Sequence, residues 1–174
     1  EISTRKAVEL QPNFANAHSN LGSILKDLGK LQEAELSTRK AIELNPDFPE
    51  AHSNLGGLLI NLGKLQEAEI STRKAIELNP DFAVAHSHLG NILRDLGKLK
   101  EAELSTRKAI EIKHDYAEAH CNLGSILIDL GQFKEAELSL RKAIKINPNF
   151  ADAYTNLGTI LEELGKRKEA ITNF

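Results

Sequence analysis

Residues 15–48 read ANAHSNLGSILKDLGKLQEAELSTRKAIELNPDF, and residues 49–82 read PEAHSNLGGLLINLGKLQEAEISTRKAIELNPDF. The two stretches have the same length of 34 residues and differ at seven positions. The pattern continues over 83–116 and 117–150, where each period keeps its Leu-Gly and Glu-Ala pairs. A short fixed period indicates a solenoid, in which each unit buries its apolar face only against its neighbours. We therefore expect the function to reside on an extended surface rather than in one catalytic pocket.

Each period predicts two helices. The first carries apolar residues at a helical spacing, namely Ala17, Leu21, Ile24, Leu25 and Leu28. Gly29 follows, and glycine adopts the left-handed conformation that commonly ends a helix. The second helix is predicted over 32–44, because Pro46 cannot continue it. Its inner stripe consists of Ala34, Thr38, Ala41 and Ile42. No stretch shows a strand pattern, so the predicted fold class is all-α.

The order of Leu-Gly, Gly, Ala, Ala and Pro within the unit resembles the tetratricopeptide repeat, a helix–turn–helix motif. The resemblance covers the whole chain and implies one array over 1–174, a right-handed α-solenoid of antiparallel helix pairs. It divides the chain into the second helix of a partial repeat, four complete repeats and a further partial repeat: 1–14, 15–48, 49–82, 83–116, 117–150 and 151–174. The chain departs from the family pattern where His replaces the early aromatic residue and Thr or Leu replaces the later one.

Histidine and cysteine give no metal pattern. Four histidines are one repeat apart, at His18, His52, His86 and His120. Stacked repeats would place these histidines roughly 10 Å from one another. A zinc ion needs each ligating ring nitrogen at about 2.0–2.1 Å from the metal, so one ion could not reach two of them. We therefore expect these histidines to pack at the half-buried aromatic position, and we expect no metal and no cofactor. Cys121 is the single cysteine and stands where other repeats have serine, so we interpret it as a packing residue.

Composition and motifs exclude several function classes. The formal net charge is −3, and each Arg-Lys pair follows a Glu, as Arg39 follows Glu35, at the spacing of a helical ion pair. Nucleic acid is therefore not an expected partner. No apolar run is long enough to span a membrane and no signal peptide is visible, so we expect a cytoplasmic protein. The chain has no phosphate loop, nucleophile elbow or metal-ligand spacing, so we expect no enzyme activity.

The sixth position of each repeat is a candidate peptide-binding row. It holds Asn20, Asn54, His88, Asn122 and Asn156. An Asn side chain offers both an acceptor and a donor, so it can pair with the backbone of an extended peptide without reading side chains. The row resembles the asparagine ladder in the tetratricopeptide arm of O-GlcNAc transferase, whose repeats also carry His-Ser-Asn-Leu. The alternative is that each Asn bonds locally between helices.

The twelfth position is the second candidate row. It holds Lys26, Ile60, Arg94 and Ile128. The resemblance places both rows on the concave face of the superhelix, where extended peptides bind in this family. Positions two, five, six and nine carry no Lys or Arg, which argues against the carboxylate clamp of chaperone-binding members. The face becomes acidic toward Asp152 and Glu163, and so we expect an extended, neutral to basic peptide segment as the ligand.

Two other functions stay open beside a peptide-binding scaffold. The array is alternatively the substrate-recognition arm of a transferase whose catalytic domain lies outside this sequence. It is alternatively a self-association module, acting through exposed ends or through a row of apolar residues on the outer side of the second helices. That row is Leu36, Ile70, Leu104 and Leu138. Isolated exposed leucines are also ordinary, and Lys and Arg stems can cover them.

Overall fold

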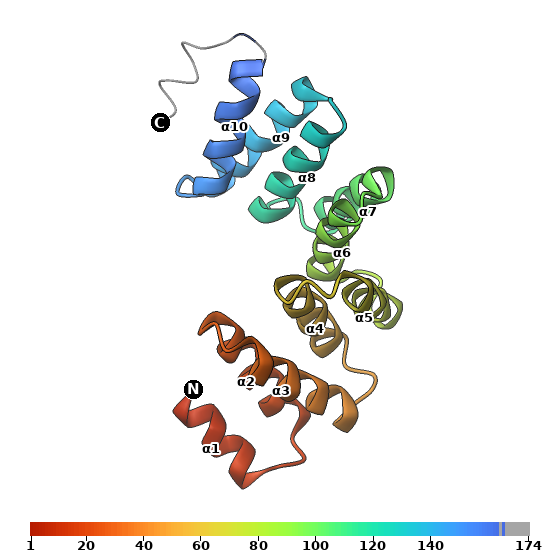
Figure 1. Ribbon diagram of the computed structural model, residues 1–174, viewed down its shortest axis with the longest axis vertical. Coiled ribbons are helices and arrows are strands. Elements are labelled where there is room, and N and C mark those ends of the chain that lie inside the picture. Colours follow the sequence, from red (N-terminus) through yellow and green to blue (C-terminus); the bar gives the residue numbers. More distant parts are fainter. Residues whose placement is uncertain (164, 166–174) are drawn as a thin grey trace. The chain divides into compact units, whose positions relative to one another are not determined.

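The computed structural model describes residues 1–163 and 165. Within these residues the chain forms ten α-helices and no strand, an all-α helical repeat solenoid (Figure 1). We call the first helix of each repeat an A helix: α2 (Ala15–Asp27), α4 (Pro49–Asn61), α6 (Ala83–Asp95), α8 (Ala117–Asp129) and α10 (Ala151–Glu163). The second helices are the B helices: α1 (Ile2–Leu10), α3 (Leu31–Leu44), α5 (Leu65–Leu78), α7 (Leu99–Ile112) and α9 (Phe133–Ile146). The helix predicted over 32–44 is thus confirmed, whereas the second helix predicted for 151–174 lies outside the described residues.

The chain forms two compact units, Glu1–Ile92 and Leu93–Phe174, with the boundary inside α6. In unit 1, α2 packs on α3 and α4 on α5, while α3 packs on α4 of the next repeat. In unit 2, α8 packs on α9, and α9 packs on α10. A helices of successive repeats also touch, as α2 touches α4 and α8 touches α10. The single array over 1–174 stays a prediction.

Each A helix ends in a glycine turn. Gly29 has a φ of 73°, and equivalent glycines in the other repeats have φ between 70° and 74°. The backbone N–H of Lys30 donates to the carbonyl of Leu25 at 2.9 Å, and that of Gly29 donates to Lys26 at 2.9 Å. These two bonds satisfy carbonyls that the helix end would leave without a partner. Glycine is required because a side chain would strain the positive φ.

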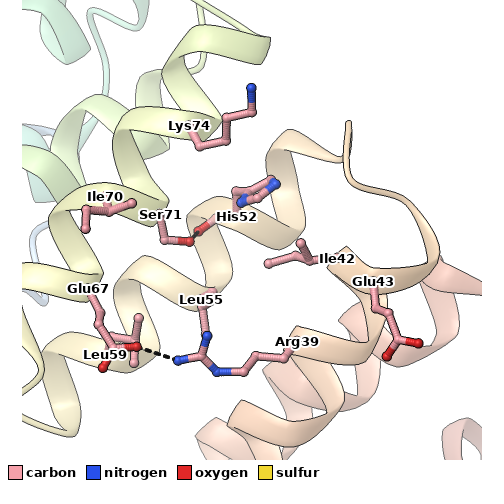
Figure 2. A pocket seen from close by; sticks show the side chains of 10 residues that line it. All are labelled: Arg39, Ile42, Glu43, His52, Leu55, Leu59, Glu67, Ile70, Ser71 and Lys74. Atoms are coloured by element: carbon pink, nitrogen blue, oxygen red, sulfur yellow. Dashed lines mark hydrogen bonds and ion pairs between the residues drawn. The ribbon is translucent and has the colours of Figure 1, made fainter.

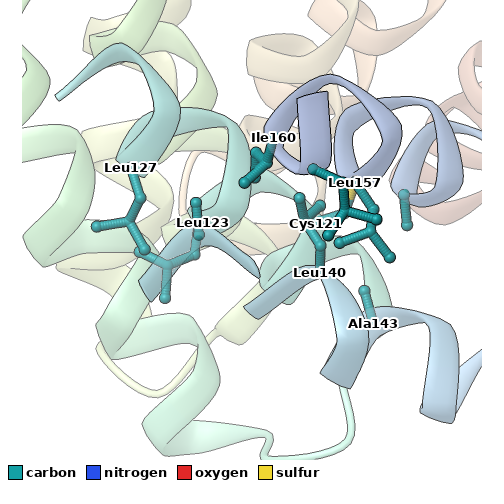
Figure 3. Close-up of a cluster of buried hydrophobic side chains, with 10 residues drawn as sticks. Cys121, Leu123, Leu127, Leu140, Ala143, Leu157 and Ile160 are labelled. Carbon is teal, nitrogen blue, oxygen red and sulfur yellow. The ribbon is translucent and has the colours of Figure 1, made fainter. Parts of the chain in front are cut away.

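The B-helix residue that faces the A helix is threonine in α3, α5 and α7 and leucine in α9. In unit 1, a Cβ built on Gly22 would overlap Thr38 Oγ1, so the glycine allows α2 and α3 to approach closely. Thr38 is buried and donates to the Ala34 carbonyl at 2.8 Å. In unit 2, Leu140 occupies the equivalent position and packs in a buried cluster with Leu123, Leu157 and their neighbours (Figure 3). A small residue facing a larger one therefore sets the spacing within each repeat.

Three residues predicted on the inner stripes are more exposed than expected. Leu28 is 53% exposed. Its equivalent Leu62 packs against the buried cluster that includes Leu21 and Leu25 of the preceding A helix. Ile24 and Ile42 are partly exposed. Ile42 lies at the edge of the stripe, where α3 meets the groove toward α5.

Candidate functional site

In unit 1, the sixth-position residues connect successive A helices. Asn54 Nδ2 on α4 donates to Ser19 Oγ on α2 at 3.3 Å. Ser53 Oγ on α4 and His88 Nδ1 on α6 lie 3.2 Å apart, at hydrogen-bond distance. Asn20 lies exposed on α2. Two rungs of the predicted ladder therefore hold neighbouring repeats together, as the alternative of local bonding expects.

In unit 2, the same position forms the same kind of contact. Asn156 Nδ2 on α10 donates to Ser125 Oγ on α8 at 3.0 Å and lies 3.8 Å from Cys121 Sγ. Asn122 is partly buried at the equivalent place on α8. Burial raises the pKa of the Cys121 thiol to about 11, because a thiolate would lose its hydration there. Cys121 is thus a buried packing residue, in agreement with the interpretation of the sequence.

His88 lies against Gly57 of the neighbouring A helix, where the missing side chain leaves room for the imidazole. A Cβ built on Gly57 would lie 3.0 Å from His88 Cε1, closer than side chains normally approach. The other repeats have Ser, Asn or Thr where Gly57 stands. Burial lowers the pKa of His88 to about 4, with the charge of Lys26 acting in the same direction. The imidazole is therefore neutral at physiological pH.

The twelfth-position residues differ in the groups that they contact. Arg94 Nε donates to Asp129 Oδ2 at 2.5 Å, and this hydrogen bond raises the pKa of Arg94. Ile128 packs against the buried cluster of unit 2. Lys26 lines a small recess together with Asn54, and Ile60 is partly buried. The sequence had counted both Lys26 and Arg94 as cations of the face, but the charge of Arg94 is balanced by Asp129.

The repeated histidines fasten the turn that precedes each A helix. The ring Nε2 of His18, His52 and His86 donates to the carbonyl of a proline six residues earlier, at 2.8 to 2.9 Å. His120 makes the same contact with the His114 carbonyl at 3.0 Å. The spacing of six residues between Pro and His was a readable signal that the sequence analysis missed. Within the described residues, no group of three or more His, Cys, Asp or Glu side chains could hold a metal ion.

Ion pairs join the B helices. Arg39 pairs with Glu35 at 2.8 Å, which confirms the predicted pairing within a helix. Arg39 also reaches Glu67 of the next B helix at 2.7 Å, and Lys64 reaches Glu35 at 2.9 Å. The hydrogen bond from Lys64, with that from Arg39, holds the pKa of Glu35 below its ordinary value. The pairs between repeats were not expected from the sequence, because they depend on how neighbouring repeats stack.

A pocket of about 560 Å³, which we call slot 1, lies between α3 and α5 over α4 (Figure 2). Its apolar lining is Ile42, Leu55, Leu59 and Ile70. Its polar rim is Arg39, Glu43, His52, Glu67, Ser71 and Lys74. The Arg39–Glu67 ion pair crosses one end, and Ser71 Oγ donates to the His52 carbonyl at 3.0 Å. Sequence analysis did not identify this pocket.

Slot 2 repeats this arrangement in unit 2, between α7 and α9 over α8. It has a volume of about 420 Å³, and its apolar lining is Ile110, Leu123 and Leu138. These residues lie 68 positions after Ile42, Leu55 and Ile70, so slot 2 is the same surface two repeats further along. The predicted outward row lies beside the slots, and all four members are exposed. Their exposed fractions are 71% for Leu36, 72% for Ile70, 71% for Leu104 and 69% for Leu138.

The predicted exposed end is present at the start of the chain. Leu10 is 73% exposed and Phe14 47%, whereas Ile2, at 86%, belongs to the outward row of Leu36. The other end, after α10, falls largely outside the described residues. Within 1–163 and 165, no helix has both the length and the apolar character needed to cross a bilayer.

Family models of one kind match most of the chain. The model described as TPR repeat matches residues 90–127 and 124–165. Two models described as Tetratricopeptide repeat match 15–48 and, for the second, 38–70 and 72–103. No catalytic family is among these matches. Comparison with curated protein sequences finds no match.

Solved structures with the same fold include three similar over most of both chains. MamA is 27% identical with a TM-score of 0.73, over 88% of this chain and 90% of that chain. YrrB, a TPR protein with an unusual peptide-binding site, is 24% identical with a TM-score of 0.69, over 98% and 88%. TTC0263 of Thermus thermophilus is 22% identical with a TM-score of 0.81, over 91% and 87%. The last two likenesses concern the fold alone.

Proposed function

Because this chain belongs to the tetratricopeptide repeat family, we propose that it is a non-catalytic scaffold that binds an extended peptide along its A helices. The observation that carries the proposal is the row of amides at the sixth position, recurring once per repeat at Asn20, Asn54, Asn122 and Asn156. Asparagine is a mediocre helix former, so its recurrence on a helical face calls for a role beyond helix formation. Bonds between repeats supply one such role at Asn54 and Asn156, and the ladder would be a second. The likeness of this row to the asparagine ladder of O-GlcNAc transferase rests on the same sequence motif and stays a prediction.

The contacts between repeats leave the amides able to bind a ligand. An Asn side chain has two N–H donors and a carbonyl with two acceptor sites. In Asn54 and Asn156, Nδ2 donates to a serine of the preceding repeat, at 3.3 and 3.0 Å. The amide is thereby fixed in orientation, although at Asn156 the same Nδ2 also donates to Cys121 Sγ at 3.8 Å, a weak contact that a peptide carbonyl would have to replace. A fixed amide binds with less loss of conformational entropy than a rotating one.

The spacing of the rungs suits an extended chain. Neighbouring A helices are expected roughly 10 Å apart, and a strand rises about 3.3 Å per residue. One rung would therefore contact about every third residue of the ligand within a unit. Such contacts involve only the backbone of the ligand. Specificity would therefore depend on other contacts, made by the ligand side chains between the rungs.

Charges near the rungs favour a neutral to basic peptide. The charges of Asp152 and Glu118 reach Cys121, beside the Asn156 rung, and both contribute to the raised pKa of its thiol. The charge of Arg94 is balanced by Asp129, so Arg94 adds little net positive charge to the face. Ile60 and Ile128 are only partly buried and can contact apolar side chains of the ligand. The acidic end should therefore take the more basic part of the peptide.

The test is a peptide-display selection on the intact chain, followed by affinity measurements with the selected peptide. Each Asn→Ala change among the four rungs should weaken binding by about 0.5–1.5 kcal/mol, or roughly 2- to 12-fold. A matched control changes Ser19 and Ser125 to Ala, which removes the bonds between repeats and keeps every amide. This control should lower the free energy of unfolding by more than it lowers the free energy of peptide binding. Undiminished binding by the quadruple Ala variant would show that the ladder is wrong, and failure to select any peptide would contradict peptide binding.

A further inference from the structure

Lys26 and Arg94 are the two cations of the twelfth row, and the chain supplies a counter-ion to only one of them. In unit 2, Arg94 donates to Asp129 on the next A helix, 35 positions later in the sequence. In unit 1, the residue 35 positions after Lys26 is Asn61, which carries no charge. Among the residues that the structure describes, Lys26 forms no ion pair. The fold therefore leaves Lys26 unbalanced at the place where it balances Arg94.

Lys26 lies on the face of unit 1 that carries the rungs. Its side chain is partly buried and lines a small recess together with Ser23 and Asn54. Its charge also helps to lower the pKa of His88, on an A helix two repeats further along. A lysine stem commonly lies along the protein surface while its ammonium group stays accessible. The free charge is therefore beside the Asn54 rung, where a bound peptide would pass.

Nearby groups of the same helix do not take the place of a counter-ion. Asp27 is the next residue, but successive residues of a helix point to different sides. Lys26 lies in the last turn of α2, where a cation interacts favourably with the helix dipole. That interaction does not require a lysine, because α4 and α8 have no basic residue in their last turns and carry Ile60 and Ile128 at the twelfth position.

We infer that Lys26 selects a peptide with an aspartate or glutamate side chain opposite unit 1, whose carboxylate pairs with Lys26 as Asp129 pairs with Arg94. The inference rests on the proposed function and names one specificity contact within it. Asn54 can support the same carboxylate, since one N–H of Nδ2 donates to Ser19 and the amide has a second. Hydrogen bonds to a charged acceptor are stronger than those to a neutral one. One acidic side chain is compatible with a peptide that is neutral to basic as a whole.

The repeat itself provides two substitutions that remove the free charge. K26I introduces the residue that stands at position 60, and it deletes the cation. N61D introduces the aspartate that stands at positions 95 and 129, and it keeps Lys26 in place while supplying an internal counter-ion. Asn61 is exposed at the end of α4, so the fold should tolerate this change. N61D is the sharper variant, because only the balance of charge is altered.

A matched control adds the same charge away from the rungs. Asn13 is exposed in the turn before α2, at the opposite end of that helix from Lys26. The next two repeats have Asp47 and Asp81 at this position, so N13D should fold normally. N13D and N61D change the net charge of the protein equally, and they differ only in where the new carboxylate lies.

The experiment uses peptides selected by display on the intact wild-type chain and then synthesised with an amidated C-terminus, so that side chains supply the only carboxylates. Each Asp or Glu of a peptide is changed in turn to Asn or Gln, and dissociation constants are measured by titration calorimetry. At one acidic position, the amide should weaken binding to the wild type roughly 5-fold, near the upper end for an ion pair that is not fully buried. The acid and amide peptides should bind alike to K26I and to N61D. N13D should keep the difference of the wild type.

The outcomes separate this inference from the proposed function. Selected peptides without an acidic residue, or an acid-to-amide loss as large in K26I and N61D as in the wild type, overturn the contact with Lys26 and leave peptide binding intact. A difference abolished in N13D as well would reflect net charge alone and overturns the contact too. Peptides that bind only with a free C-terminus would place a terminal carboxylate there instead of a side chain. Failure to select any peptide contradicts peptide binding itself, and the inference falls with it.

Discussion

In unit 1 the rung on α6 is His88, bonded to Ser53 at 3.2 Å, whereas in unit 2 the rung on α10 is Asn156, bonded to Ser125 at 3.0 Å. The imidazole needs more room than an amide, and Gly57 provides it, since any Cβ there would approach the ring to 3.0 Å. In sequence, His88 and Gly57 look like two unrelated exceptions to the repeat. In the structure they are one exchange, in which a large residue on one helix requires a small one on its neighbour.

The largest expected difference between the two rungs appears on acidification. The pKa of His88 falls from 6.5 to about 4 on folding because burial disfavours the imidazolium. Between these values the unfolded chain binds a proton at this site and the folded chain does not. The free energy of unfolding should therefore keep its full His88 contribution above pH 6.5 and lose about 3 kcal/mol by pH 4. Asn156 does not titrate and should give no such loss.

Urea unfolding at several pH values measures this effect when the wild type is compared with G57S/H88N, which installs the unit 2 rung in unit 1. Other groups also titrate in this range, but they are common to both chains and cancel in the difference. The wild type should lose more stability than the double variant as the pH falls. Parallel pH profiles for the two chains would show that His88 is readily protonated in the folded state.

A substitution at Gly57 should distinguish the His88 rung from the Asn156 rung at neutral pH. G57S adds atoms against His88 Cε1, so we expect a loss of roughly 1–3 kcal/mol from overpacking. In the H88N background the same change restores the arrangement of Ser125 and Asn156 and should be neutral or stabilising. The difference between the two backgrounds is the coupling energy of a double-mutant cycle. Equal effects of G57S in both backgrounds would mean that Gly57 and His88 are independent.

The same contrast explains how far the sequence could be read. Helix ends, such as the turn at Gly29, and pairs within a helix, such as Glu35 with Arg39, follow from local spacing and were predicted correctly. The bond from Asn54 to Ser19 and the pair of Arg39 with Glu67 join residues 35 and 28 positions apart. A helical wheel gives the direction of a side chain within one repeat, but it does not give the translation and rotation that bring the next repeat beside it.

The same limit applies to the contacts made by the predicted site residues. The sequence predicted the sixth and twelfth rows from their fixed period, which is visible without coordinates, and their role in binding stays a prediction. It could not show that Arg94 is balanced by Asp129, because that contact crosses from one A helix to the next. Nor could it reveal slot 1, whose volume depends on the separation between α3 and α5. The outward direction of Leu36, by contrast, follows from helical geometry alone, and its exposure of 71% confirms it.

The smallest expected effect concerns the Asn156 rung. Asn156 Nδ2 is 3.0 Å from Ser125 Oγ and only 3.8 Å from Cys121 Sγ, and sulfur is a weak acceptor. The bond to Ser125 therefore holds this rung, and C121S should change the free energy of unfolding by less than about 0.5 kcal/mol. The serines at the equivalent position in other repeats show that the site accommodates this side chain. Because burial raises the pKa of the thiol to about 11, a thiol reagent should label the folded chain far more slowly than the urea-unfolded chain. Rapid labelling of the folded protein, or a large loss of stability in C121S, would instead place Cys121 in an open contact on which the rung depends.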